Sequence, residues 1–524
     1  MRKSRIIIMT IALVVVVAIA FWFGDNEGLR YKANDGSAVS YLDSIHIGVV
    51  ADFDLSFDPR FGDSVEAIMF TPLLYSGLVR LNSSATPQPS LALSWEQPDD
   101  LSWIFYLREN AFFKDDSTLD ARDVKYTFDS LRDHNLDTPL SSLYSVIDSV
   151  EIIGDYTVQF NLNQPYAPFI YYMDVPVVPE NCDKDSGWLG APFGVGPYLL
   201  QQSGARELRL QANPYYFGNA PNTKELVFHI YDNDAAMFSD FKAGEIDLFL
   251  PTGGSWNDSF VDFESVTPQT ILSNDCLMLV FSQESIFFTQ RDLRLALTYL
   301  VDKQAICEEV HSGLAKPAAN LLIPGYWYFQ KTKGSDYNTS RASSILTKAG
   351  WIDTDYNSVL DKDGEDLRFN VLVDEDKPEH MDALDILIKT WEQQGIVAEI
   401  EAVDDITKRL CEPWDYDVAL ISINMPAAPD YTLTSLFSSD SPDNIGGYTN
   451  AELDRFLKQV QSETNHDARL PIYGAISDLI NAQVFCLPIA NEPYTVICNT
   501  RLDDFTLYPN GSLAGLVYAH VQAE

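Results

Sequence analysis

One stretch, residues 90–131, specifies its own local structure more completely than any other part of the chain. Every second residue from Trp103 to Leu107 is large and apolar, which is typical of a strand with two unlike faces. Asp115-Asp116-Ser117 then supplies turn formers. Asp120 stands where a helix N-cap is expected, with Asp123 three positions later as an acidic capping-box variant. The stretch therefore predicts a strand, a turn and a capped helix, a scaffold without catalytic chemistry.

The same stretch also carries a longer pattern, P-x-L-A-x-S-W-E-x-x-D-D-x-x-W-x-F-x-L-R, which resembles the signature of the family 5 extracellular solute-binding proteins. Two later stretches resemble that family in the expected order. The first runs from Gly194-Val195-Gly196-Pro197-Tyr198 to residues 241–247, and the second holds residues 292–297 and Val301-Asp302-Lys303. Three ordered matches are much more specific than one. The resemblance implies a large binding protein of an ABC importer for oligopeptides, dipeptides or nickel.

The length of 524 residues predicts two or three domains. Strand, helix and strand alternate between Leu226 and Leu250, which indicates an α/β class. The resemblance implies a two-lobed, type II periplasmic-binding-protein-like fold with an extra subdomain. The expected parts are a signal segment or membrane anchor (1–24), a tether (25–42), lobe 1 (43–72 and 190–282), its extra subdomain (73–189), lobe 2 (283–490) and a return to lobe 1 (491–524).

The N-terminus has the composition of a membrane segment. Arg2, Lys3 and Arg5 precede an apolar run from Ile6 to Phe23, which is long enough to span a bilayer and places the N-terminus in the cytoplasm. An uncleaved anchor is our interpretation, and removal after Ala18-Ile19-Ala20 is the alternative. The rest of the chain is then expected on the outer side of the cell membrane.

The charge balance excludes one class of partner, and the cysteines raise the question of disulfide bonds. A net charge of −41 argues against nucleic acid as a partner, because phosphates need a basic surface. The six cysteines form no C-x-x-C motif. Outside the cell they could pair, and Cys486 with Cys498, flanking an expected pair of strands, is one bridge to consider; buried free thiols are the alternative.

Nothing in the sequence predicts an enzyme, a metal site or a cofactor. The seven histidines include no pair at ligand spacing, and neither G-x-S-x-G nor a P-loop occurs. Asp361-Lys362-Asp363-Gly364 is similar to part of a calcium loop but lacks the later glutamate, so a hairpin turn is expected there.

Aromatic residues beside expected loops are the first candidates for ligand contacts, since rings often line binding pockets. Tyr75, Trp256, Trp327 and Tyr328 have such positions. Phe53 lies in a segment that resembles the family's first ligand-side loop. The complete set of expected ligand-binding residues is Phe53, Tyr75, Trp256, Ser282, Trp327, Tyr328, Met425 and Asp430.

The segment from Asn424 to Asp430 departs from the family pattern. In peptide-binding members, the resemblance implies an aspartate just after a strand, where it pairs with the α-ammonium of the peptide. Asn424 or Met425 takes that position here. Asp430 could replace the missing acid, and a turn residue after Pro429 is the alternative. A buried ammonium needs a partner, so the choice of ligand depends on this question.

The function that these observations favour is a monomeric, importer-linked peptide receptor that closes about a hinge over its ligand. Its expected partners are the solute and separately encoded permease and ATPase subunits. A receptor for an oligosaccharide or a metal chelate is the alternative within the family. A membrane-tethered sensory or chaperone-like binding protein is the alternative outside it.

Overall fold

A computed structural model describes residues 41–50, 57–61, 65–133, 138, 140–184, 193–251, 266–411 and 413–523. The predicted anchor, Phe53 and Trp256 lie outside these residues, so their predictions stay predictions. Within the described ranges no helix combines the length and the apolar character that a membrane span requires.

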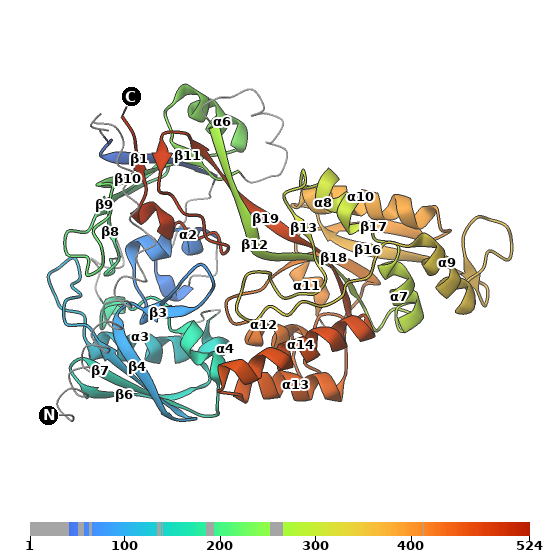
Figure 1. The fold of residues 1–524 in the computed structure, drawn as a ribbon, viewed down its shortest axis with the longest axis horizontal. Helices are drawn as coiled ribbons and strands as arrows, with labels where there is room; N and C mark the ends of the chain where they lie inside the picture. The colour runs from blue at the N-terminus through green and yellow to red at the C-terminus, as the bar shows by residue number, and fades with distance from the viewer. Residues whose placement is uncertain are drawn as a thin grey trace, which may run out of the picture. The chain divides into compact units, whose positions relative to one another are not determined.

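Eleven strands of the described chain form one sheet, in the order β17-β16-β18-β12-β19-β11-β1-β10-β9-β8, with β13 (Lys316–Pro317) paired to β19. Its middle is made by two long antiparallel strands, β12 (Val266–Phe281) and β19 (Cys486–Asn499). Figure 1 shows these two crossing strands running between the two ends of the sheet. We call these the β1 end and the β16 end.

The β1 end contains β1 (Ser44–Val50), β8 (Tyr198–Gly204), β9 (Glu207–Ala212), β10 (Glu225–Tyr231) and β11 (Leu248–Phe249). Helix α2 (Val65–Leu74) and the 3-10 helix η6 (Ala514–Val517) pack with these strands in one apolar core. Helix α6 (Asp234–Ala243) ends at Gly244, which has a φ of 80° and donates to carbonyls of the last turn. This confirms the helix and the glycine stop that the sequence predicts.

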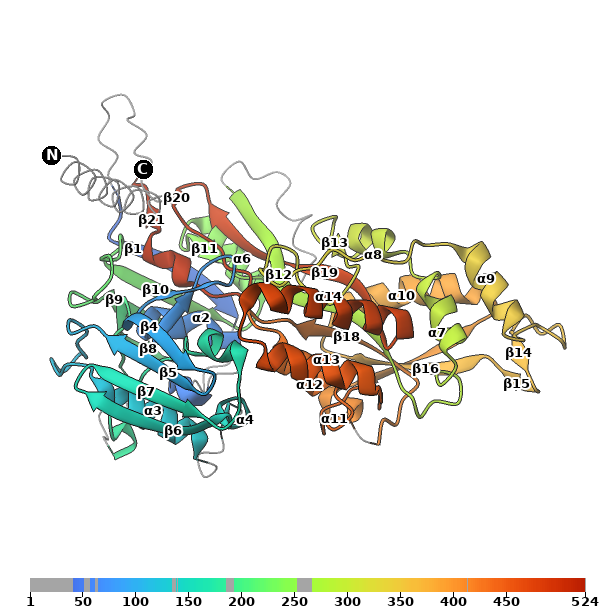
Figure 2. The ribbon, with the colours of Figure 1, turned by 60° about the horizontal axis from the view of Figure 1, so that its bottom comes forward.

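A separate four-stranded sheet, in the order β4-β5-β7-β6, is formed by the chain between α2 and β8. Its strands are β4 (Ala92–Asp99), β5 (Ser102–Leu107), β6 (Ile147–Gly154) and β7 (Thr157–Leu162), and helix α3 (Ala121–Arg132) covers it (Figure 2). Trp103, Phe105 and Leu107 are buried, whereas Tyr106 is exposed. Asp120 and Asp123 form the predicted capping box at the start of α3. The structure therefore confirms the strand and the capped helix.

Small elements link these parts to the rest of the chain. They are η1 (Pro59–Phe61), β2 (Val79–Leu81), β3 (Pro87–Pro89), α4 (Ser141–Tyr144), η3 (Ala167–Tyr172), η4 (Cys182–Lys184), β20 (Leu502–Asp503) and β21 (His520–Val521).

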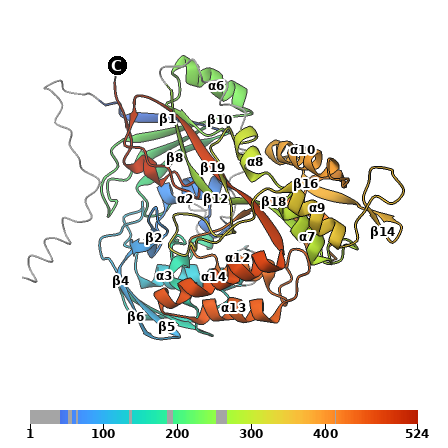
Figure 3. The same cartoon turned by 45° about the vertical axis from the view of Figure 1, so that its right-hand side comes forward.

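The β16 end contains β16 (Arg368–Asp374), β17 (Val397–Val403) and β18 (Val418–Asn424). Its helices are α7 (Arg291–Thr298), α8 (Lys303–Glu309), α9 (Thr339–Lys348), α10 (Pro378–Glu392), α11 (Thr407–Leu410), α12 (Asp430–Phe437), α13 (Ala451–Ser462) and α14 (His466–Gln483). Helix α10 lies on one side of the sheet and α12–α14 on the other (Figure 3).

Both faces of this end are therefore covered, and β12 shows it residue by residue. Leu279 and Phe281 belong to one apolar core, whereas Met278 and Val280 belong to the other. A strand that is buried on both faces reads as a continuous apolar run, as this part of β12 does. Asp302 caps α8 and Asn450 caps α13, as predicted.

The structure corrects one prediction and confirms another. Cys486 and Cys498 lie at opposite ends of the single strand β19, about 40 Å apart at about 3.3 Å per residue, so the bridge between them is wrong. All six cysteines are free. The segment around Asp363-Gly364 is the expected hairpin, formed by β14 (Asp361–Lys362) and β15 (Glu365–Asp366).

Candidate functional site

A cavity of about 580 Å³, which we call the central pocket, lies where the crossing strands meet β18. The β16 end contributes residues of β18, α10 and α11, and the β1 end contributes Met69 of α2, Pro251 and residues 509–511. Residues 492–495 of β19 form part of its wall. A cavity that is lined from both ends of the sheet changes shape whenever those ends move about the crossing strands.

One edge of β18 is open at this pocket. Strand β16 pairs with β18 only from Val418 to Leu420, whereas β12 pairs with it as far as Asn424 on the other side. The N–H of Met425 donates to the carbonyl of Asn274 next to β12, over 2.8 Å. Because peptide groups alternate in direction along a strand, those of Ser422 and Asn424 face the open edge. Within the described chain no strand pairs with them there.

The pocket is acidic. Four carboxylate residues line it, against one lysine and two histidines; the acids are Asp275, Asp374, Glu379 and Glu492. Asp275 lies on β12 opposite Asn424, whose side-chain amide donates to the carboxylate over 2.9 Å. The Nε2 atom of His380 lies 2.9 Å from Ser422 Oγ and 4.0 Å from Glu492 Oε1.

Burial changes the protonation of two of these groups. It raises the pKa of Glu492 to about 7, with further contributions from Asp275 and Glu379, and a hydrogen bond from Ser422 opposes the shift. Burial also lowers the pKa of His380 to about 4, so this imidazole is neutral near pH 7. The Nδ1 atom of His380 and the Oε2 atom of Glu379 are buried without a hydrogen-bond partner in the structure. Buried polar atoms of this kind are usually satisfied, so these two are unusual features of the pocket wall.

Substitution of Glu492 by glutamine should stabilise the protein more at pH 8 than at pH 5. The folded-state pKa of about 7 lies above the usual 4.5, so the folded protein holds a proton that the unfolded chain has released between these values. The stability contributed by Glu492 therefore falls as the pH rises from 4.5 to 7 and stays low above 7. Glutamine removes that loss, which is up to about 3 kcal/mol.

Urea denaturation of both proteins at pH 5 and pH 8 measures this difference. His380 is present in both, so its own titration cancels. The exposed Glu375, which does not line the pocket, offers the matched control as Glu375→Gln. A stability difference between wild type and Glu492→Gln that is the same at both pH values would contradict the assignment.

Asp430 lies in a second polar cluster. Its side chain is fully buried, and both carboxylate oxygens accept from Nη2 of Arg469 over 2.7 Å. The hydroxyl of Tyr473 also donates to Oδ2 over 2.7 Å. In this arrangement a ligand ammonium would have to displace Arg469 from the carboxylate. The predicted role of Asp430 toward an ammonium stays a prediction, and the structure shows its ion pair with Arg469.

The other predicted residues of the β16 end surround this cluster. Met425 is fully buried, and the hydroxyl of Tyr328 donates to the carbonyl of Pro426 over 3.0 Å. The indole N–H of Trp327 donates to the carbonyl of Ala427 over 2.9 Å. These aromatic side chains hold the loop between β18 and α12 in place. None of them lines the central pocket.

This loop also contacts the η3 segment, which packs with the four-stranded sheet. The ring of Tyr171 stacks on Trp327 at 5.3 Å between centroids. The hydroxyl of Tyr172 donates to the carbonyl of Ala428 over 2.9 Å. The β16 end is thus in contact with the η3 segment beside the four-stranded sheet, away from the crossing strands.

Ser282 and Tyr75, which were also predicted to contact ligand, hydrogen-bond to backbone carbonyls outside the central pocket. The hydroxyl of Ser282, at the end of β12, donates to the carbonyl of Trp414 over 3.0 Å. The hydroxyl of Tyr75 donates to the carbonyl of Phe57 over 2.8 Å. Neither lines the central pocket, although Tyr75 supports the segment that follows residues 51–56.

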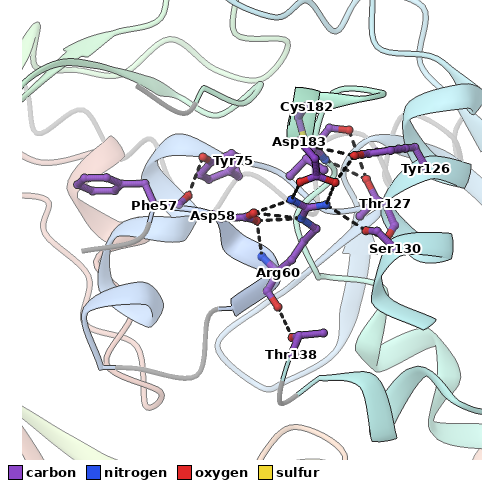
Figure 4. A network of polar contacts seen from close by, with 11 residues as sticks. Phe57, Asp58, Arg60, Tyr75, Tyr126, Thr127, Ser130, Thr138, Cys182 and Asp183 are labelled. Atoms are coloured by element: carbon purple, nitrogen blue, oxygen red, sulfur yellow. Dashed lines mark hydrogen bonds and ion pairs between the residues drawn. The ribbon is translucent and has the colours of Figure 1, made fainter. Parts of the chain in front are cut away.

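Figure 4 shows how that segment is held. Arg60 is 1% exposed and binds the carboxylates of Asp58 and Asp183 over 2.6 and 2.5 Å. Its guanidinium also donates to Ser130 Oγ on α3 over 3.3 Å. A buried, multiply bonded arginine of this kind joins the segment rigidly to the four-stranded sheet and α3.

The acids of the central pocket were not among the predicted residues, although the sequence contains a signal for them. Asp275 is the single charged residue of β12, and Glu492 is the single charged residue of β19. A lone carboxylate in a long, otherwise uncharged strand is unusual enough to select as a candidate.

A group of three carboxylates also lies outside the central pocket. Asp353, Asp355 and Asp361 each bring one oxygen to within 4.8 Å of the others, and no other described residues form such a group of three possible metal ligands. The carboxylate of Asp361 accepts hydrogen bonds from the N–H and the hydroxyl of Thr354, over 2.6 and 2.7 Å. Hydrogen bonds of the local turns therefore account for Asp361 in this group.

Comparison with known proteins defines the class of protein first. The chain resembles solved structures of binding proteins over most of its length. It matches a substrate-binding protein of an ABC transporter from Listeria monocytogenes, CtaP, with a TM-score of 0.82, 22% identity and coverage of 92% of this chain and all of that one. It also matches the oligopeptide-binding protein AppA of Bacillus subtilis, solved with a nonapeptide, with a TM-score of 0.76, 21% identity and coverage of 93% and 100%. The mixed α/β fold is that of these binding proteins.

The family follows from the sequence comparison. Residues 86–444 match the model of the bacterial extracellular solute-binding proteins, family 5. The chain belongs to this family, as the resemblance implies. Its curated relatives include AppA of Bacillus subtilis, 22% identical over 98% of this chain and 95% of the relative. They also include the nickel-binding periplasmic protein of Escherichia coli, 26% identical over 57% of this chain and 60% of the relative.

Proposed function

We propose that this protein is the receptor of an ABC importer and that it binds peptides. The observation that carries the proposal is the open edge of β18 beside the central pocket. An extended peptide can pair with such an edge through its backbone and place alternate side chains in the pocket. Backbone pairing is largely independent of sequence, which suits a receptor for peptides of many kinds.

The proposed mechanism is closure about the crossing strands. The β1 end with the four-stranded sheet would act as one lobe, with the latter as its extra subdomain, and the β16 end as the other. The contacts of Tyr171 with Trp327 and of Tyr172 with Ala428 belong to the closed form in this proposal. A ligand drives closure only if it contacts both lobes more extensively in the closed state.

The remaining parts of the proposal follow from the family. The protein would be a monomer without catalytic activity, held on the outer side of the cell membrane by residues 1–24. Separately encoded permease subunits would recognise the closed form, and ATPase subunits would drive transport. AppA is described as an oligopeptide-binding protein, which supports peptides as the solute class.

Native mass spectrometry of the protein, purified without refolding, tests the solute class. We expect a set of added masses that match short peptides. A single non-peptide mass would contradict the peptide assignment. Binding that begins only when a nickel chelate or an oligosaccharide is added would contradict it too and would identify another solute.

Backbone pairing has its own test. Trialanine should bind at least about 10-fold more tightly than an analogue with methylated backbone amides, because methylation removes donors and keeps the peptide away from β18. Asn424→Pro should weaken trialanine binding beyond the effect of Asn424→Ala, since proline removes the N–H at the open edge. Equal binding of both peptides would exclude pairing with this edge.

A further inference from the structure

Each crossing strand carries one carboxylate residue, and both residues reach the central pocket. Asp275 is the acid of β12, and Glu492 is the acid of β19. The register pairs Cys276 with Asn491, so the two acids are the next residues on adjacent strands. The negative charge of Asp275 contributes to the raised pKa of Glu492.

Neither carboxylate forms an ion pair with a lysine or arginine of the described chain, where none lies within 4.0 Å of them. The contact of Glu492 with His380, at 4.0 Å, is with a neutral imidazole. Asn424 donates to Asp275, which orients the carboxylate without neutralising it. Lys377 also lines the pocket and partly offsets the raised pKa of Glu492, but it forms no ion pair with either acid. Carboxylates in such a largely enclosed wall are normally paired, so a cationic ligand group would complete this arrangement.

We infer that Asp275 and Glu492 bind the α-ammonium group of the peptide. The inference rests on the proposed function and deepens it by naming the group that the receptor selects. Asn424 lies at the end of the open edge of β18 and directly beside Asp275. A peptide that begins at the two acids can therefore extend along the peptide groups of Asn424 and Ser422. The acid that is missing at Asn424 or Met425 is thus supplied by the crossing strands.

The same geometry favours an ammonium over a metal ion. The acids and His380 do not form a group of three ligand atoms within 4.8 Å, whereas such a group is found elsewhere in the described chain. An ammonium needs only acceptors placed around its three N–H bonds, and two carboxylates from adjacent strands provide them. Both acids belong to the strands that join the two ends of the sheet, so the ligand charge lies at the proposed hinge.

Binding of the ammonium should depend on pH because Glu492 must release its proton. The charged or titratable groups around Glu492 are Asp275 on β12 and Lys377, Glu379 and His380 at the start of α10. With the pKa of Glu492 about 7 in the free protein, affinity should fall as the pH drops from 7 to 5.5, a range in which the α-amino group of the peptide, with a pKa of about 8, stays protonated. His380, with a pKa of about 4, stays neutral over this range.

Isothermal titration of the full-length protein with trialanine and N-acetyl-trialanine tests the inference. Wild type should prefer the free amine by at least about 10-fold, since a charge-assisted bond is lost on acetylation. In Glu492→Gln and Asp275→Asn this preference should fall to about 3-fold or less, and the fall in affinity between pH 7 and pH 5.5 should disappear in Glu492→Gln. Glu375→Gln removes one negative charge from an exposed position outside the pocket, and it should keep the preference.

The outcomes separate the two proposals. Equal binding of both peptides by wild type, or an unchanged preference in Glu492→Gln, would overturn the ammonium site and leave the peptide receptor standing. If neither peptide binds, thermal shifts with n-butylammonium and with neutral butyramide decide. Stabilisation by the amine alone, lost in Glu492→Gln, would support the site and refute the peptide; no stabilisation would refute both. Because Glu492→Gln should be more stable than wild type at pH 8, lost affinity cannot be assigned to unfolding.

Discussion

Replacing Asp430 by asparagine is expected to lower the free energy of unfolding by about 3–5 kcal/mol. Asp430 is 0% exposed and Arg469 is 2% exposed, and the two form an ion pair at 2.7 Å. Asparagine leaves the guanidinium buried without a countercharge, although Tyr473 can still accept a bond from it. Urea denaturation at pH 7 measures the loss.

A paired substitution is the control for this effect. Asp430→Leu combined with Arg469→Met replaces both charges by apolar groups, and it should recover most of the stability, because neither charge is then left alone. If Asp430→Asn instead costs less than about 1 kcal/mol and abolishes binding of trialanine, Asp430 would be a ligand residue in place of the acids of the crossing strands.

Replacing Gly196 by alanine should destabilise the fold by more than about 3 kcal/mol. A β-carbon at Gly196 would lie 2.3 Å from the carbonyl carbon of Leu74 at the end of α2. The N–H of Gly196 donates to that same carbonyl over 3.0 Å. The clashing atoms belong to the backbone of Leu74 and Tyr75, so no rotation of a side chain can relieve the clash. Thermal unfolding and the yield of folded protein report the effect.

Gly204→Ala provides the matched control within β8. Its β-carbon would meet nothing closer than the carbonyl oxygen of Glu207 at 3.5 Å, an ordinary contact. Alanine there should change stability by less than about 1 kcal/mol. Similar losses for the two variants would show that close packing against α2 does not explain Gly196.

Local chemistry accounts for the parts of the structure that the sequence predicts well. The capping box of Asp120 and Asp123, the glycine stop at Gly244 and the N-cap at Asp302 each depend on residues within four positions of one another. The alternation of the buried Trp103 and Phe105 with the less buried Ile104 and Tyr106 likewise needs only the period of a strand. Such features hold because no distant segment competes with them.

The predictions near β19 show where local reasoning ends. Two short strands were expected between Phe485 and Cys498, but pairing with β12 along its length makes them one strand. That continuity places Cys486 and Cys498 at opposite ends and excludes their bridge. It also brings Glu492 beside Asp275, which is more than 200 positions earlier in the sequence.

The sequence by itself determined the family, the α/β class and the caps, and its resemblance to the family predicts that Asn424 or Met425 stands where peptide-binding members have an acid. These depend on residue identity and short spacing. Only the tertiary structure decided which acids could replace that one. Asp430 is paired with Arg469, whereas Asp275 and Glu492 line the central pocket with no lysine or arginine of the described chain within 4.0 Å of them. The reason is physical: a carboxylate's role depends on its nearest cation, and that neighbour is set by the pairing of distant strands.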